Sequence, residues 1–250
     1  MTRQLGHLSS PQVRDQITAS SVLCLPVGST EQHGRHLPVD TDTVIAAGFT
    51  NQLAQTHGEE LDLWVLPALP FGLALEHAWA PGAISLRTNL YAELVLQLVG
   101  EYVRATGARR LVIVNGHGGN RGVLEPLLRE LAHDQHIEGI VVHPLSLTAT
   151  RPRTDRPEVH AGIVETSLML ALAPALVRLD QLTVGATWFR RRSKSTGWSA
   201  TAVSPGHGPA TTRASPPTAS SAATPPTRPP TLAGNSSRKP WPPAPTPSAT

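Results

Sequence analysis

The chain has little cysteine and contains no segment that resembles a targeting or membrane sequence. Its single cysteine, Cys24, excludes an intrachain disulfide framework and stands in an apolar run, where a buried structural thiol is expected. The N-terminus lacks the apolar core of a signal peptide. No apolar run approaches the roughly 20 residues that a membrane span needs. We therefore expect a cytoplasmic protein that has no membrane partner.

Lysine is absent from the first 180 residues, and acidic residues are absent from the last 70. The first part carries thirteen arginines against eighteen acids, a net charge of −5, whereas the last part carries eight basic residues. The overall charge of +3 therefore belongs to the C-terminal part. The basic run 190–194 is not accompanied by an aromatic groove, so we interpret it as solvated and expect no nucleic-acid partner.

Residues 186–250 differ in composition from the rest of the chain. Thirteen of the 24 prolines lie within 205–250, among Ala, Thr, Ser and Arg. Such a segment has too few large apolar side chains to offset the entropy of ordering, so we predict a disordered tail. One interpretation is a natural Pro-rich linker. We favour another: a GC-rich gene, as the use of arginine without lysine suggests, read in a shifted frame that replaces a native acidic C-terminal segment.

Short apolar runs alternate with amphipathic segments along the first 172 residues. The apolar runs predict strands at 21–26, 63–66, 111–114 and 139–143. The amphipathic segments predict helices at 43–55, 90–106, 121–134 and 165–172. In the clearest helix, the expected buried stripe has residues that recur every four positions, widened by three valines: Leu90, Leu94, Leu98 and Tyr102, with Val95, Val99 and Val103. We therefore predict an α/β domain over residues 1–185, doubly wound, with a mostly parallel sheet and helices on both faces.

The first polar motif follows the strand predicted at 21–26. It reads GSTEQHGRHLP and continues to Asp42. Residues i and i+2 of an extended chain face the same way, so Glu31 and His33 can converge on one point. Two carboxylates and an imidazole suit a divalent ion such as zinc, manganese or iron. A polar surface loop would explain any one of these residues, but three potential ligands within twelve residues favour a metal site.

The second motif, NGHGGN, follows the strand predicted at 111–114 and precedes a helix. Its glycines let the backbone approach a ligand, and the helix N-terminus offers N–H groups to an anion. A phosphate-binding loop is the competing interpretation, but the lysine that usually follows such glycines is absent, and His117 suits a metal better. We expect the turn formed by Gly118, Gly119 and Asn120 to contact the substrate and to help hold an oxyanion.

The third motif, HAGIVETS, opens the helix predicted at 165–172. Glu165 in a first helical turn is favourable through the helix dipole alone, which is its simplest explanation. In a functional interpretation, Glu165 adds a carboxylate that binds a metal or orients the reacting groups. His160 is then the expected proton donor to a leaving amine.

Together the three motifs resemble the creatininase (creatinine amidohydrolase) family over roughly residues 20–185. The resemblance implies a doubly wound α/β domain, a homo-oligomer that is often a hexamer, and one or two divalent ions. It carries the family's metal ligands onto four residues, Glu31, His33, His117 and the bridging carboxylate Asp42. It also implies that Glu76 and His77 lie near the substrate.

At one position the second motif differs from that of creatininase itself. The resemblance implies the pattern NGHxEN there, with a metal-binding Glu where this chain has Gly119. A second ion would need another carboxylate, and Glu165 is the candidate. The difference argues against creatinine as the substrate. The strings PVGSTEQHGRHLPVDTDT and PEVHAGIVETSLML are most similar to the branch of the family in the mycofactocin system, which trims a C-terminal dipeptide from a modified precursor peptide.

The sequence thus predicts a metal-dependent hydrolase of C–N amide bonds with a small peptide substrate. The metal would activate a water molecule and polarise the scissile carbonyl. Two alternatives remain open at this point. One is a creatinine or formamide-type amidohydrolase with a small-molecule amide substrate. The other is a folded but inactive truncated homologue that has lost its native C-terminal segment.

Overall fold

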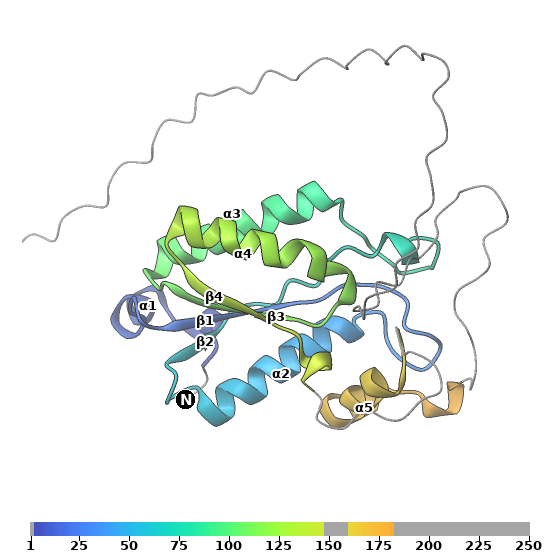
Figure 1. The fold of residues 1–250 in the computed structure, drawn as a ribbon. Helices are drawn as coiled ribbons and strands as arrows, with labels where there is room; N and C mark the ends of the chain where they lie inside the picture. Colours follow the sequence, from blue (N-terminus) through green and yellow to red (C-terminus); the bar gives the residue numbers. More distant parts are fainter. Residues whose placement is uncertain (1–2, 148–159, 183–250) are drawn as a thin grey trace, which may run out of the picture. The chain divides into compact units, whose positions relative to one another are not determined.

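Four parallel strands form the centre of the described chain, which comprises residues 3–147 and 160–182 of a computed structural model (Figure 1). The strands are β1 (Val22–Val27), β2 (Leu63–Val65), β3 (Arg110–Asn115) and β4 (Glu138–Val142), in the order β2-β1-β3-β4. Val22 pairs with Arg110 and Val27 pairs with Asn115, so β1 and β3 end at the same edge of the sheet. All four strands lie where the sequence predicts them, and the predicted parallel arrangement is confirmed.

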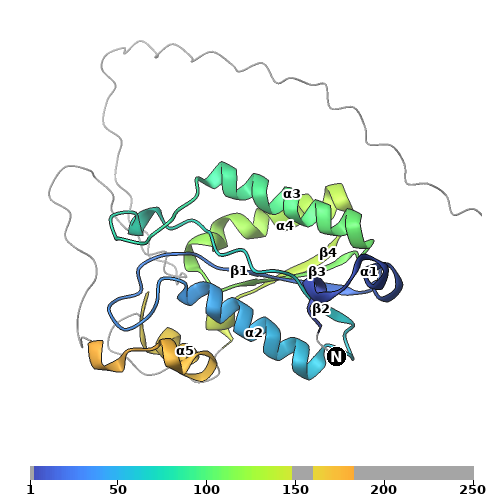
Figure 2. The ribbon, with the colours of Figure 1, turned by 180° about the vertical axis from the view of Figure 1, so that it is seen from behind.

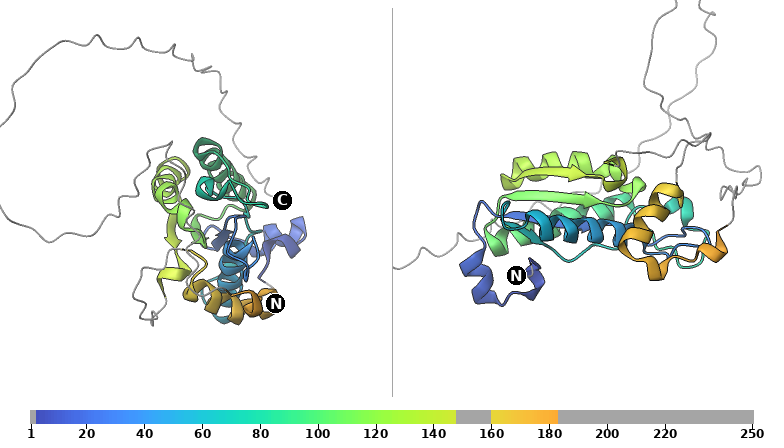
Figure 3. Two further views of the ribbon diagram at one scale, coloured as in Figure 1. Left: turned by 90° about the vertical axis from the view of Figure 1, so that its right-hand side faces the viewer. Right: turned by 90° about the horizontal axis from the view of Figure 1, so that it is seen from below.

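Helices cover both faces of this sheet. The helices are α1 (Ser10–Gln16), α2 (Thr41–His57), α3 (Thr88–Thr106), α4 (Arg121–Gln135) and α5 (Ile163–Leu172), with short 3-10 turns that include η2 (Leu75–His77) and η3 (Gly118–Asn120). Helices α3 and α4 lie on one face, and α2 lies on the other with α5 beside it (Figures 1 and 2). The side view gives the same two layers (Figure 3). No helix in these described ranges is long and apolar enough to cross a membrane.

The core alternates between the two faces along β1. Leu23, Leu25 and Val27 belong to the larger cluster, together with side chains of α3 and α4. Cys24 belongs to a second cluster with Ala46 of α2. Burial raises the pKa of the Cys24 thiol to about 12, and this agrees with the structural role expected for it.

The buried stripe of α3 runs along the three predicted valines, and the predicted leucines lie at its side. Its fully buried residues are Tyr91, Val95, Val99 and Val103. Leu90 is 53% exposed, so the predicted start of the stripe is wrong. Leucines such as Leu98 are partly buried and pack at the margin of the cluster.

The predicted tail at residues 186–250, its proposed frameshifted origin and the domain boundary near residue 185 lie outside the described residues.

Candidate metal centre

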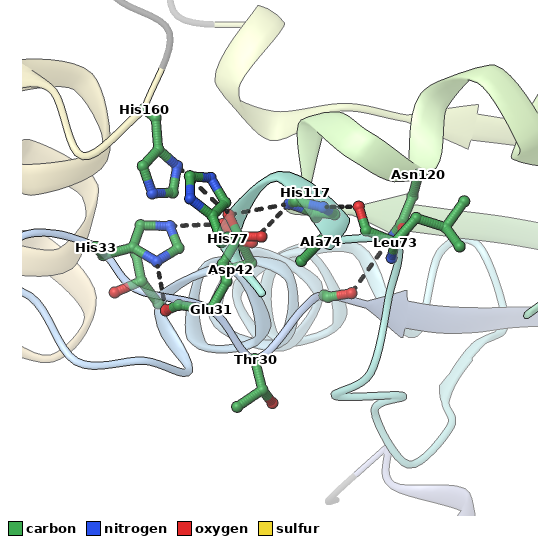
Figure 4. A network of polar contacts seen from close by, with 12 residues as sticks. Thr30, Glu31, His33, Asp42, Leu73, Ala74, His77, His117, Asn120 and His160 are labelled. Atoms are coloured by element: carbon green, nitrogen blue, oxygen red, sulfur yellow. Dashed lines mark hydrogen bonds and ion pairs between the residues drawn. The ribbon is translucent and has the colours of Figure 1, made fainter. Parts of the chain in front are cut away.

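The predicted ligands lie at the carboxyl edge of the sheet, on loops that follow neighbouring strands. Glu31 and His33 follow β1, and His117 follows β3. Asp42 stands in the first turn of α2, which begins at Thr41, two residues earlier than predicted. These four side chains are buried, none of them more than 5% exposed. The sequence motifs therefore meet at one point, as Figure 4 shows.

Asp42 joins the two loops through its two carboxylate oxygens. Its Oδ1 lies 3.1 Å from Nε2 of His33, and its Oδ2 lies 2.9 Å from Nδ1 of His117. The two imidazoles lie on opposite sides of this carboxylate (Figure 4). Oε1 of Glu31 lies 3.4 Å from Nδ1 of His117 and 3.4 Å from Nδ1 of His160. The Asp42 carboxylate thus lies between two neighbouring positions, one beside His33 and one beside His117.

Two glycines allow the start of α2 to reach this point. A Cβ atom at Gly116 would lie 2.1 Å from the carbonyl oxygen of Asp42. A Cβ atom at Gly28 would lie 2.5 Å from the backbone nitrogen of Thr43. Since no side chain fits at such distances, glycine at the end of both strands is what brings Asp42 between the two loops.

Three imidazoles of the site are oriented in the same way. His33 Nδ1 lies 3.2 Å from the carbonyl oxygen of Glu31, and His117 Nε2 lies 2.9 Å from that of Leu73. His160 Nε2 contacts the carbonyl oxygen of Gln32. A carbonyl oxygen only accepts, so each of these nitrogens carries the hydrogen. The other nitrogen of each ring then faces the carboxylates of Asp42 or Glu31, and in the neutral ring this nitrogen carries a lone pair.

A divalent cation fits this donor set. Lone pairs that face carboxylates repel them unless a positive charge lies between. Glu31 Oε2 is buried and makes no hydrogen bond within the described ranges, and a buried carboxylate oxygen without a partner is costly. Asp42 Oδ2 is also buried and faces Nδ1 of His117 at 2.9 Å. Ring nitrogens held by backbone carbonyls are the usual arrangement of metal-binding histidines. Donor atoms of Glu31, His33 and Asp42 lie within 4.8 Å of one another, as metal ligands require.

The pKa values of His117 and His33 also indicate that the site favours a positive charge. In the protein alone, burial lowers the pKa of His117, but the carboxylates of Asp42 and Glu31 outweigh it and raise the pKa to about 11. Burial likewise opposes the charged form of His33, yet Asp42 raises its pKa to about 9. In the metal-free protein the buried carboxylates therefore favour a proton on the ring nitrogens that face them. A metal ion bound between the same groups would supply this positive charge in place of the proton.

A model of the creatinine amidohydrolase family matches residues 6–224 of the chain. The chain belongs to the creatininase family.

Relatives of two kinds resemble this creatininase-family hydrolase. The mycofactocin precursor peptide peptidase of Mycobacterium tuberculosis is 38% identical over 189 residues, which are 72% of this chain and 70% of that protein. The creatinine amidohydrolase of Pseudomonas putida is 31% identical over 199 residues, 71% of this chain and 75% of that protein. A solved structure described as creatininase Mn is 30% identical with a TM-score of 0.60, covering 73% of this chain and 77% of that one.

Glu165, the expected second carboxylate of this family member, lies beside His33. One donor atom each of Glu165, His33 and His160 lies within 4.8 Å of the others. Burial raises the pKa of Glu165 to about 7, whereas burial lowers that of His160 to about 4. This second group contains His33 and therefore lies on the His33 side of Asp42.

In the turn after β3 of this family member, the side chain of Asn120 makes structural hydrogen bonds. The Asn120 side chain is fully buried. Its Nδ2 donates to the carbonyl oxygen of Gly28 (3.1 Å) and to Oδ1 of Asn115 (3.2 Å), and its Oδ1 accepts from the backbone N–H of Leu73 (3.1 Å). These bonds engage both polar atoms of the amide. The side chain of Asn120 therefore holds three site loops together.

The neighbouring glycines differ from each other. A Cβ atom at Gly119 would lie 2.3 Å from the carbonyl oxygen of Leu73 and 2.5 Å from Nε2 of His117, whereas a Cβ atom at Gly118 would meet no atom within 4 Å. The close approach of Leu73 thus leaves no room for a side chain at position 119. Gly118 borders open space, which is compatible with the expected substrate contact.

The other expected substrate residues lie on η2. His77 has 12% of its side chain exposed, and its Nε2 lies 3.8 Å from Oε1 of Glu31. Glu76 is exposed beside it. Two residues of the site escape the sequence reasoning. Leu73 acts through its backbone carbonyl, for which no sequence signal exists, whereas Gln32 stands inside the first motif and could have been chosen for its position between Glu31 and His33.

Proposed function

We propose that this protein is a metal-dependent hydrolase that cleaves an amide bond near the C-terminus of a modified precursor peptide, as in mycofactocin biosynthesis. The observation that carries the proposal is the orientation of three imidazoles, of which those of His33 and His117 are buried. His33, His117 and His160 each donate one N–H to a backbone carbonyl and turn the other nitrogen towards a carboxylate. The likeness to a mycofactocin precursor peptide peptidase supports the peptide substrate.

Two cation positions are proposed, one on each side of Asp42. Glu31, His117 and Asp42 Oδ2 would hold the first, and Asp42 Oδ1, His33 and Glu165 the second, with zinc, iron or manganese as the metal. A bound cation would lower the pKa of a coordinated water and polarise the scissile carbonyl. The solved creatininase described with Mn supports a divalent metal in this family.

The residues of the chain would then handle protons and orientation. The backbone carbonyls of Leu73 and Glu31 fix the rings of His117 and His33, so that no ring has to turn during the reaction. Nδ1 of His160 faces Glu31 at 3.4 Å and is the atom proposed to accept a proton and deliver it to the leaving amine. The open side of Gly118 is the proposed approach for the peptide.

The metal dependence is tested on the full chain with the modified precursor peptide. We expect removal of metal with a chelator to abolish cleavage, and zinc, manganese or iron(II) added singly to restore it. His117→Ala should lower the rate at least about 10³-fold because it removes a ligand on the side of Glu31. His133→Ala, at a ring that is 89% exposed, is the matched control and should behave as the wild type. Full activity after complete loss of metal would refute the proposal.

The substrate is tested by comparing the peptide with creatinine and with formamide-type amides. The likeness to the creatinine amidohydrolase of Pseudomonas putida supports the second candidate, whereas Gly119 in place of a metal-binding Glu argues against it. We expect kcat/KM for the peptide to exceed that for creatinine by at least about 10²-fold. A preference for creatinine would replace the peptide substrate and leave the metal chemistry in place.

The assembly is proposed to be a homo-oligomer, as the family resemblance implies. Light scattering after size-exclusion chromatography measures the mass directly, and a monomer would contradict this part of the proposal. A chain that holds no metal and cleaves none of these substrates would instead be the inactive homologue.

A further inference from the structure

One imidazole of the site has the opposite polarity from the three others. Nδ1 of His77 lies 3.0 Å from Nε2 of Gln32. Oε1 of the same Gln32 amide lies 3.1 Å from the backbone nitrogen of Gly34. A backbone N–H only donates, so it identifies the amide oxygen of Gln32 and leaves the NH₂ group facing His77. Gln32 therefore donates to Nδ1 of His77, and the hydrogen of this ring is on Nε2.

We propose that His77 is a hydrogen-bond donor to the substrate, not a metal ligand, and that Gln32 is the positioning residue that sets its tautomer. The inference rests on the proposed hydrolase function. Donor atoms of Glu31, His77 and His160 lie within 4.8 Å of one another, as those of the proposed metal ligands do. By spacing alone this group would count as a further cation site, and the tautomer of His77 excludes it. The lone pair of His77 is already engaged by Gln32, so Nε2 presents a hydrogen where a metal would need an electron pair.

The ring of His77 is held firmly in this orientation. It stacks on the ring of His160, with centroids 4.3 Å apart and an interplanar angle of 22°. The ring of His160 in turn packs on His33 at 4.3 Å. Gln32 at one edge and His160 on one face thus fix both the position and the hydrogen of His77. A donor fixed before the substrate arrives needs no reorganisation when charge develops in the reaction.

The N–H of His77 points into the site from its outer side. Nε2 lies 3.8 Å from Oε1 of Glu31, which is beyond hydrogen-bond distance, so Glu31 does not satisfy this donor. The His77 side chain is 12% exposed, whereas Glu31 beneath it is 1% exposed. A substrate that enters from solvent would therefore meet His77 before it reaches the buried carboxylates. During amide hydrolysis the carbonyl oxygen gains negative charge, and a neutral N–H aimed at it would stabilise that charge.

The first experiment compares His77→Phe with His133→Phe in the full zinc-loaded chain. His133 is the matched control because its ring is 89% exposed. We expect His77→Phe to retain the zinc stoichiometry and affinity of the wild type, since His77 is not a ligand. Its kcat should fall about 10²- to 10³-fold with a smaller change in KM, as for the loss of one donor to an oxyanion. A tenfold or greater loss of zinc affinity, or an unchanged kcat, would overturn the proposal.

The second experiment tests the tautomer and the role of Gln32. In zinc-loaded protein with ¹⁵N-labelled histidine, NMR should find Nε2 of His77 protonated and Nδ1 unprotonated. Gln32→Glu keeps an acceptor for the N–H of Gly34 but offers Nδ1 a carboxylate, so Nδ1 should become protonated in this variant. A protonated Nδ1 in the wild type would refute the inference.

If Gln32 acts only through His77, the effects of Gln32→Glu and His77→Phe on kcat should not add. We expect the kcat of the double variant Gln32→Glu, His77→Phe to equal that of His77→Phe alone, and additive losses would show that Gln32 acts elsewhere. If the wild type cleaves no amide at all, the proposed function fails. Zinc binding by His77→Phe and the NMR assignment still decide whether His77 is a donor, so the two failures are distinguishable.

Discussion

Replacing Gly119 with alanine should destabilise the protein and weaken metal binding at the proposed centre, whereas the same change at Gly118 should do neither. The new Cβ atom would lie 2.3 Å from the carbonyl oxygen of Leu73, and real Cβ atoms essentially never come closer than 3.0 Å to another atom. The backbone at Leu73 would have to retreat by about 0.7 Å, the difference between these distances. That carbonyl accepts the Nε2 hydrogen of His117 at 2.9 Å, so the bond that orients His117 would break.

The magnitude follows from two effects. Overpacking a buried site costs about 1–3 kcal/mol, and the loss of one hydrogen bond costs about 1 kcal/mol. We therefore expect Gly119→Ala to lower the free energy of unfolding by about 2–4 kcal/mol. Gly118→Ala meets no atom within 4 Å, so it should be neutral or should stabilise by up to about 1 kcal/mol by restricting the unfolded chain.

Urea denaturation of the metal-free protein measures the stability, and calorimetric titration with zinc measures the affinity. Loss of the backbone acceptor that holds a metal-binding histidine lowers metal affinity about 10- to 100-fold. We expect this loss for Gly119→Ala and wild-type affinity for Gly118→Ala. If the two variants match each other in both stability and affinity, the role assigned to the Leu73 carbonyl is wrong.

Two further substitutions test the core and the sheet. Tyr91→Phe should leave the stability unchanged or raise it by about 1 kcal/mol in thermal melts, because the Tyr91 hydroxyl is buried and makes no hydrogen bond within the described ranges; a loss of more than 1 kcal/mol would reveal a partner for it. Asp62→Ala should cost about 2 kcal/mol in urea denaturation, since this carboxylate accepts from Arg3 (3.0 Å) and from Trp64 Nε1 (3.0 Å). Asp15→Ala, at an exposed side chain, is its control, and equal costs would contradict the assignment.

The sheet and the meeting of the candidate ligands at one edge could be predicted because their signals are local. Each strand is a short apolar run, and Glu31, His33 and His117 directly follow two of these runs. In a parallel sheet, loops at the carboxyl ends meet at one edge, so proximity in space follows from the order of the motifs.

Features that depend on distant partners could not be predicted. The acceptor for His117 is a backbone carbonyl 44 residues away, and no side chain signals it. The partner that sets the tautomer of His77 is Gln32, which lies 45 residues away. It stands in a motif whose charged residues indicate a metal site, and nothing in that motif indicates a contact with His77. The sequence places Asn120 in a turn whose N–H groups can face a substrate, but it does not show that the Asn120 side chain binds three loops, because only the fold determines their approach.

The shared carboxylate of Asp42 makes the two sides of the site interdependent. Its oxygens serve His33 on one side and His117 on the other, but they share a single negative charge. A cation or proton taken up on one side withdraws part of that charge from the other. The first binding event must therefore weaken the second by the same factor by which the second weakens the first. Two cations at the proposed positions would therefore bind with two unequal constants, and no single affinity would describe them.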